Sequence, residues 1–263
     1  MRQSANRWIK NLKTFFSSIK SNVIAFLLLL LSWFFLGLLI SDSNIIPSPF
    51  LVIWNFFDFF TVHFVTDHLL ITLFRVLIGF IIAFILGTGI GLLDYMLSKK
   101  VSLNSYFIML QTIPGVVLVI ICIRIFGLGS VVPVFLIAFF TLPIIAVNTF
   151  NALTKKSRHL EDYIISLGGG RKNLLLDLYL PLLVPTMRSN VTIGLGLALK
   201  IIILGEFVGS QNGIGHLLNI ETYYYRMDKV FFYLLIIFLI MLIVQIFTTY
   251  IFKTLLKKFS YQN

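Results

Sequence analysis

Residues 69–93 read LLITLFRVLIGFIIAFILGTGIGLL, an apolar stretch with a single charged side chain, Arg75. A helix needs about 20 residues to cross the hydrocarbon core of a bilayer, which is about 30 Å thick. A helix of this composition has no polar face to turn toward water. The stretch therefore predicts a membrane-spanning helix.

The remainder of the chain has the same character. Of its 263 residues, 59% are hydrophobic and 12% are charged, and the mean hydropathy is +0.99. About a quarter of the residues of a soluble domain are charged. The composition predicts an all-α integral membrane protein, because helices satisfy their own backbone hydrogen bonds in lipid.

Five further apolar blocks accompany residues 69–93, so we expect about six transmembrane helices. The first block follows a basic segment, as in a signal peptide, but it is long for one. Ser41-Asp42-Ser43 offers no cleavage pattern, so we expect this span to be retained. The other five blocks lie at 23–40, 106–126, 131–147, 191–204 and 230–252, and the fifth of the six, 191–204, is short.

The net charge of +11 is concentrated between alternate blocks. The loops on one side hold most of the cations, whereas the opposite loops hold only Arg226 and Lys229. The positive-inside rule then places both termini in the cytoplasm, and this distribution argues against a nucleic-acid-binding surface. The cations assigned to the cytoplasm are Arg2, Arg7, Lys10, Lys13, Lys20, Lys99, Lys100, Lys155, Lys156, Arg158, Arg171, Lys172, Arg188, Lys253, Lys257 and Lys258.

These patterns divide the chain into three parts. We expect a basic cytoplasmic N-terminus at 1–22, a transmembrane domain at 23–252 with a cytoplasmic loop at 154–188, and a basic cytoplasmic C-terminus at 253–263. The aromatic run Phe50–Phe60, which follows two prolines, predicts an interfacial helix on the outer face.

Within the cytoplasmic loop, residues 161–181 read EDYIISLGGGRKNLLLDLYLP. An acidic start, a run of glycines and a closing proline predict a helix, a sharp turn and a second helix. An amphipathic helix lying on the inner membrane surface is the alternative interpretation.

This segment resembles the EAA loop of binding-protein-dependent ABC importer permeases, whose pattern is E-A-A, three residues, Gly, nine residues and I-x-L-P. Asp162 stands at the position of the Glu, Tyr163-Ile164 replace the two alanines, and Gly168 and Pro181 occupy the later positions. In that family the loop docks into a separate ATPase subunit. The resemblance implies that the coupling residues are Glu161, Asp162, Ser166, Leu167, Gly168, Arg171, Lys172 and Pro181.

The resemblance extends from about Ile45 to Lys257 and is greatest to the nitrate, sulfonate and taurine permeases. It implies a type I ABC importer fold in the cell membrane, a second permease protomer with which the chain forms a homodimer, and an extracytoplasmic binding protein. ATP and Mg²⁺ would be bound by the ATPase, and this chain would need no cofactor. The matching motifs are Ile46-Pro47-Ser48-Pro49, Gln111-Thr112-Ile113-Pro114, Phe126-Gly127-Leu128-Gly129, Gly205-Glu206-Phe207-Val208-Gly209 and Gly213-Ile214-Gly215.

Pro114 lies inside the third apolar block, where it removes a helical hydrogen bond. A broken helix at membrane depth is tolerated in a protein interior or along a water-filled path. Gln111, Thr112 and Pro114 are therefore candidates for the translocation pathway, and a purely structural kink is the alternative.

Three cations, Arg75, Arg124 and Lys200, lie within the predicted spans. They could line a path for a small anion such as nitrate, sulfonate or taurine, or they could extend to the outer headgroups. We favour the second interpretation for Arg75 and Arg124. Lys200, with Glu206 nearby, is retained as a pathway candidate together with Glu206.

The sequence lacks the motifs that are typical of catalytic and metal-binding sites. It contains no phosphate-binding loop, no nucleophile elbow, and no histidine spacing typical of a metal site, so we expect neither an enzyme nor a metalloprotein. An intramembrane enzyme would need paired catalytic groups at one depth, and a secondary transporter usually has coupling carboxylates in mid-membrane. These two classes are the alternatives to an ATP-driven importer.

Overall fold

The computed structural model describes residues 24, 26–40, 42, 44–97, 103–155 and 159–259, with the backbone alone at 104 and 252–259. All regular secondary structure in these ranges is helical, as predicted. The predicted N-terminal segment 1–22 and the cations Lys99, Lys100, Lys156 and Arg158 lie outside the described residues.

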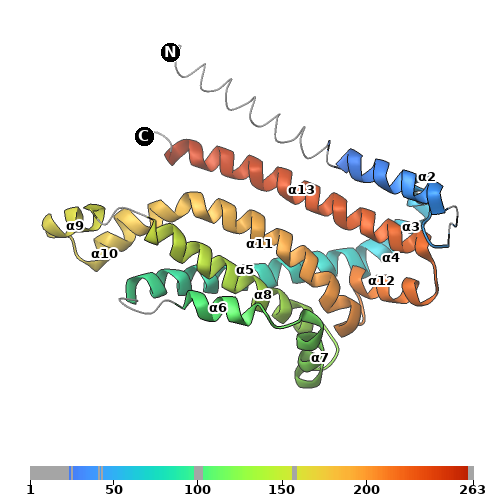
Figure 1. Ribbon diagram of the computed structural model, residues 1–263, viewed down its shortest axis with the longest axis horizontal. Helices are drawn as coiled ribbons and strands as arrows, with labels where there is room; N and C mark the ends of the chain where they lie inside the picture. The colour runs from blue at the N-terminus through green and yellow to red at the C-terminus, as the bar shows by residue number, and fades with distance from the viewer. Residues whose placement is uncertain are drawn as a thin grey trace, which may run out of the picture. The chain divides into compact units, whose positions relative to one another are not determined.

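The chain forms two compact units. One comprises the described residues up to Val65 together with Leu218–Lys253, and the other includes Thr66–Leu217. The second unit carries the loop that resembles the EAA segment. Its helices are α5 (Leu70–Leu97), α6 (Asn104–Leu110), α7 (Gly115–Phe126), α8 (Val131–Thr154), α9 (His159–Ser166), α10 (Arg171–Asn173), the π-helical η2 (Leu174–Tyr179) and α11 (Leu180–Gly209) (Figure 1).

Each of the six predicted apolar blocks corresponds to an apolar helix in the described part of the chain. Four helical stretches are long and apolar enough to cross a membrane, and Phe26–Ile40 and Gly115–Phe126 are shorter apolar helices. The four long stretches are Val62–Leu97, Val131–Thr154, Arg171–Gly209 and Met227–Ile251.

Two of the predicted blocks differ from the observed helices in their extent. The third, 106–126, is divided at Pro114 into α6 and α7, so the predicted break is confirmed. The fifth, expected at 191–204, is the middle of α11, which begins eleven residues earlier at Leu180. Its first part escaped the hydropathy pattern because residues 181–190 contain two prolines and several polar side chains.

The core of the second unit lies where α5, α8 and α11 pack against one another (Figure 1). The face of α5 toward α8 is built from small residues at intervals of four, a spacing that places side chains on one side of a helix. Small residues let two helix backbones approach closely in a membrane. These residues are Gly79, Ala83, Gly87 and Gly91, all buried.

A methyl group at Gly87 is expected to destabilise this packing. A Cβ atom there would lie 2.8 Å from the carbonyl oxygen of Leu142 and 3.0 Å from Cβ of Ile145. Gly89, two residues further along α5, has no atom within 4 Å of such a Cβ. We expect Gly87→Ala to lower the free energy of unfolding by about 1–3 kcal/mol through overpacking. Gly89→Ala should be neutral or slightly stabilising.

Unfolding of both variants in detergent, followed by circular dichroism, would measure this difference. Equal stabilities of Gly87→Ala and Gly89→Ala would contradict the close packing of α5 on α8.

The first unit contains the helix Phe26–Ile40 and the short helices α2 (Pro49–Trp54), α3 (Phe56–Phe59) and α4 (Val62–Phe64). It also contains α13 (Met227–Phe259) as far as Lys253. The boundaries between the two units in the chain fall within η1 (Val65–Leu69) and α12 (Ile214–Tyr223). α2 and α3 occupy the aromatic run for which an interfacial helix was predicted, and the run forms two short helices rather than one.

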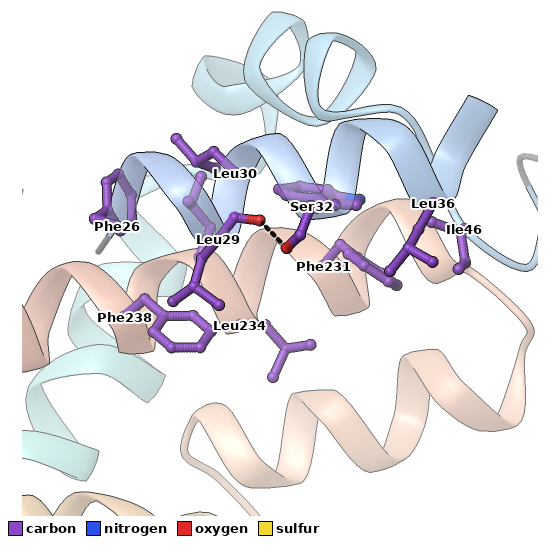
Figure 2. A pocket seen from close by; sticks show the side chains of 11 residues that line it. Phe26, Leu29, Leu30, Ser32, Leu36, Ile46, Phe231, Leu234 and Phe238 are labelled. Atoms are coloured by element: carbon purple, nitrogen blue, oxygen red, sulfur yellow. Dashed lines mark hydrogen bonds between the residues drawn. The ribbon is translucent and has the colours of Figure 1, made fainter. Parts of the chain in front are cut away.

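An apolar crevice of about 240 Å³ separates part of the Phe26–Ile40 helix from α13 (Figure 2). Trp33 lies at this crevice, where its ring is 5.1 Å from that of Phe231 and its indole N–H donates to the carbonyl oxygen of Pro47 at 2.9 Å. The remaining lining is almost wholly aliphatic and aromatic, which is the surface expected of helices that contact lipid.

Candidate functional site

The segment 159–181 folds as the predicted helix, sharp turn and helix. α9 ends at Ser166, and Gly168 follows with a φ of +82°, a left-handed conformation that is costly for a residue with a side chain. The N–H groups of Gly168 and Gly169 donate to the carbonyl oxygens of Ile165 and Ile164, both at 2.9 Å. These two bonds form a Schellman motif, which closes the C-terminus of the helix. The glycine at 168 therefore sets the direction in which the chain leaves α9.

One side of α9 rests on the membrane helices. Ile164 packs against a buried cluster formed by Leu153, Leu178, Tyr179 and Leu183, which come from α8, η2 and α11. Glu161, on the same side, accepts a 2.6 Å hydrogen bond from the hydroxyl group of Tyr95 in α5. α9 is thus attached to the ends of α5, α8 and α11.

The other side of α9 is apolar and exposed. We call Leu160, Tyr163 and Leu167 the outer face of α9. Leu167 directly follows α9, and its N–H donates to the carbonyl oxygen of Tyr163 at 3.2 Å, so the helical spacing extends to it. The spacing of three and four residues places the three side chains on one side, and they are 45%, 63% and 70% exposed. Three large apolar side chains presented together form an exposed apolar patch.

The other predicted coupling residues lie on α9, on α10 and at the beginning of α11. Asp162, Ser166, Arg171, Lys172 and Pro181 are all exposed, and Glu161 is half-buried. The Ser166 hydroxyl donates to the carbonyl oxygen of Tyr163 at 2.8 Å, which further fixes the last turn of α9. The structure therefore places the acidic residues and Ser166 on α9, the two cations on α10 and Pro181 in the first turn of α11.

The predicted pathway residues Gln111, Thr112 and Pro114 lie in the break between α6 and α7. All three are exposed in the single chain. Thr112 donates its hydroxyl to the carbonyl oxygen of Met109 at 2.8 Å, and Pro114 has an extended backbone with φ −61° and ψ 128°. Lys200 is exposed on α11.

Arg75 is buried, so the prediction that it extends to the headgroups is wrong. Its side chain is 2% exposed, and Nη1 lies 2.8 Å from Oε1 of Glu206, which is fully buried. Arg75 also donates to the Ser130 hydroxyl, at 2.9 Å from Nη2, and to the carbonyl oxygen of Asn212 at 2.9 Å. Its charge is therefore matched inside the protein and has no need to reach the lipid surface.

Glu206 is enclosed by hydrogen-bond donors. Thr72, one turn before Arg75 on α5, donates its hydroxyl to the carboxylate at 2.8 Å, and the Gly215 N–H donates at 3.0 Å. Gly213 lies so close to the carboxylate that a side chain there would overlap it. The segment after α11 can therefore close over Glu206 only with glycine at this position.

Sequence reasoning missed the pairing of Arg75 with Glu206. The two residues are separated by 131 positions, and hydropathy reports each block separately. The available signal was that a lone cation and a lone carboxylate in different spans both need partners. Lys200, which the sequence pairs with Glu206 by proximity, instead lies exposed on α11.

Comparison with known proteins agrees with this architecture. Residues 76–257 match the family model described as "Binding-protein-dependent transport system inner membrane component". The chain is 31% identical to the riboflavin transport system permease protein RibX of Chloroflexus aurantiacus, with 74% of both chains covered. It is 28% identical to the formylaminopyrimidine transport permease protein ThiX of Halalkalibacterium halodurans, over 73% of this chain and 76% of the relative.

Two further similarities extend the comparison. A putative aliphatic sulfonates transport permease protein, SsuC of Bacillus subtilis, is 24% identical over 74% of this chain and 71% of its own. A chain of the MetNI methionine ABC transporter, solved in inward-facing conformations, has the same fold. It superposes with a TM-score of 0.59 at 17% identity, over 71% of this chain and 94% of that chain. The chain therefore belongs to the family of binding-protein-dependent transport system inner membrane components, and it is a multi-pass permease subunit of an ABC importer rather than an enzyme.

Proposed function

We propose that this chain is driven by a separate ABC ATPase, which receives the outer face of α9 in a surface groove. The observation that carries the proposal is the exposure of Leu160, Tyr163 and Leu167 at a helix that is attached to the membrane helices through Ile164 and Glu161. Burying such side chains in a groove stabilises an interface by roughly 1.5–3 kcal/mol for each fully buried residue. ATP and Mg²⁺ are bound by that partner, and the movement enters this chain through α9.

The remaining partners follow from the family. The chain pairs with a second permease protomer in the cell membrane, in contact with lipid, and an extracytoplasmic binding protein delivers the solute. Gln111, Thr112, Pro114 and Lys200, all exposed in the single chain, line the pathway between the protomers. Relatives named for riboflavin, a formylaminopyrimidine and aliphatic sulfonates carry chemically different solutes.

For this chain we propose a small solute, with a preference for an anion. Lys200, an exposed cation among the proposed pathway residues, is the side chain on which this preference rests. Arg75 contributes nothing to it because its charge is paired with Glu206. The same pair argues against a secondary transporter, since the buried carboxylate is occupied by an arginine instead of a coupling ion.

Crosslinking from position 167 tests the docking. Cys122 is the sole cysteine and is 1% exposed, so the native chain should take up little of a benzophenone maleimide and serves as the labelling blank. Leu167→Cys adds one exposed thiol on the outer face. After illumination of the membranes, we expect the labelled Leu167→Cys protein to crosslink to an ABC ATPase subunit.

Tyr224→Cys is the matched control. Tyr224 is 60% exposed, close to the 70% of Leu167, but it lies in the loop before α13 that the charge pattern assigns to the outer side of the membrane. It should label without capturing the ATPase. If labelled Leu167→Cys captures no ATPase, or if both positions capture it equally, the outer face of α9 is not the docking surface.

A further inference from the structure

Glu161 is held by tyrosines from two membrane-spanning stretches. The hydroxyl group of Tyr95, near the end of α5, donates to Oε1 at 2.6 Å. Tyr179, the last residue of η2 before α11, lies beside Glu161, and Ile164 of α9 packs against the cluster that contains Tyr179. The two tyrosine rings meet edge to face with their centroids 5.5 Å apart. We call Tyr95, Glu161 and Tyr179 the tyrosine clamp.

The surroundings of the clamp favour strong bonds. Tyr179 is 5% exposed, and Tyr95 and Glu161 are half-buried. The Tyr95 ring also contacts that of Phe150 in α8, at 6.3 Å between centroids. Hydrogen bonds to an ionised carboxylate are roughly twice as strong as those between neutral groups, and partial exclusion of water strengthens them further. The clamp therefore joins α9 to α5 and α11 directly.

The backbone connects α9 to α11 and α5 less tightly than the side chains of the clamp do. α9 is followed by Gly168, Gly169 and Gly170, whose backbone freedom would let α9 turn without moving α11. Along the chain, α5 is connected to α9 only through α6, α7 and α8. A push on the outer face of α9 consequently needs a side-chain contact to reach α5.

We propose that the tyrosine clamp transmits the movement of α9 to α5 and α11. Tyr95, Glu161 and Tyr179 are in this sense positioning residues for transport, because they act through the helices and touch no solute. The proposal rests on the proposed docking of α9 to an ATPase. If the clamp only stabilised α9, its loss would lower the amount of bound ATPase. If it transmits movement, its loss leaves the ATPase bound but reduces the effect of ATP on α5 and α11.

The test uses the complete transporter, purified with its ATPase and reconstituted in nanodiscs. Hydrogen exchange is measured by mass spectrometry with and without ATP plus vanadate, in the native protein and in Tyr95→Phe, Tyr179→Phe, the double variant and Glu161→Gln. Tyr106→Phe is the matched control, because it loses the same hydroxyl group from a tyrosine of α6 that is 61% exposed.

In the native protein and in Tyr106→Phe, ATP plus vanadate should alter exchange in α9 and in the adjoining ends of α5 and α11. In the double variant the amount of bound ATPase should be unchanged. The change in hydrogen exchange that ATP plus vanadate causes in α5 and α11 should fall about tenfold, as expected for the loss of hydrogen bonds to a charged group. Each single variant should show a smaller loss.

Three results would overturn the clamp. The double variant could respond like the native protein, it could lose its ATPase, which would assign the clamp a structural role only, or the native response could be confined to α9. If the native protein purifies without any ATPase, the proposed function fails and the clamp fails with it.

Discussion

Replacing Arg75 with alanine is expected to lower the free energy of unfolding by about 3–5 kcal/mol, because it leaves the charge of Glu206 buried without its partner. Glu206 is fully buried, and Arg75 supplies its only cationic contact among the described salt bridges. The variant also releases Ser130 and Asn212, which Arg75 bonds. Equilibrium unfolding of the purified protein in detergent, monitored by circular dichroism, measures this loss.

Two comparisons isolate the buried charge. Arg124→Ala removes an exposed arginine near the end of α7, and it should change stability by less than about 0.5 kcal/mol. The double variant Arg75→Met, Glu206→Met removes both charges and should cost less than Arg75→Ala alone. If Arg75→Ala costs no more than Arg124→Ala, the pair does not stabilise the second unit.

Valine at position 168 is expected to reduce the ATPase that co-purifies with this chain by about tenfold. Gly168 has φ +82°, and a side chain in the left-handed region costs roughly 1–2 kcal/mol, most severely when it is β-branched. The last turn of α9 would open to relieve this strain, and Leu167 would leave its place on the outer face. An affinity pull-down with quantitative mass spectrometry measures the bound ATPase.

Gly170→Val is the control for this prediction. Gly170 lies in the same run of glycines, but its backbone is extended, with φ −88° and ψ −174°, and no atom lies within 4 Å of an added Cβ. Valine adopts this conformation readily, so Gly170→Val should retain the ATPase. If Gly168→Val and Gly170→Val lose the same amount of bound ATPase, the left-handed turn at Gly168 is not the cause of the loss.

Much of the fold was predictable because each decisive feature is local in the sequence. The apolar blocks, the break at Pro114 and the turn after α9 each depend on residues within a few positions of one another. The beginning of α11 was not predicted, because Pro181 and Pro185 suggest an irregular segment. Proline is tolerated in the first turn of a helix, and the helix continues past Pro185 to Gly209.

The contacts that organise the functional residues were beyond prediction for a different reason. Arg75 and Glu206, and likewise Tyr95 and Glu161, come from helices far apart in the chain. Their pairing depends on how α5, α8 and α11 pack, and hydropathy and motif spacing carry no information on that packing. The predicted coupling residues, in contrast, occupy one continuous segment, so their helix and turn could be predicted from local sequence alone.

Purification of the native, tagged chain in a mild detergent, with every co-purifying protein identified by mass spectrometry, tests the central claim most directly. The proposed function predicts an ABC ATPase subunit in an amount comparable to that of the permease, since the outer face of α9 is exposed and ready to bind it. A folded, intact permease that purifies without any ATPase would contradict the claim that this chain is driven through α9.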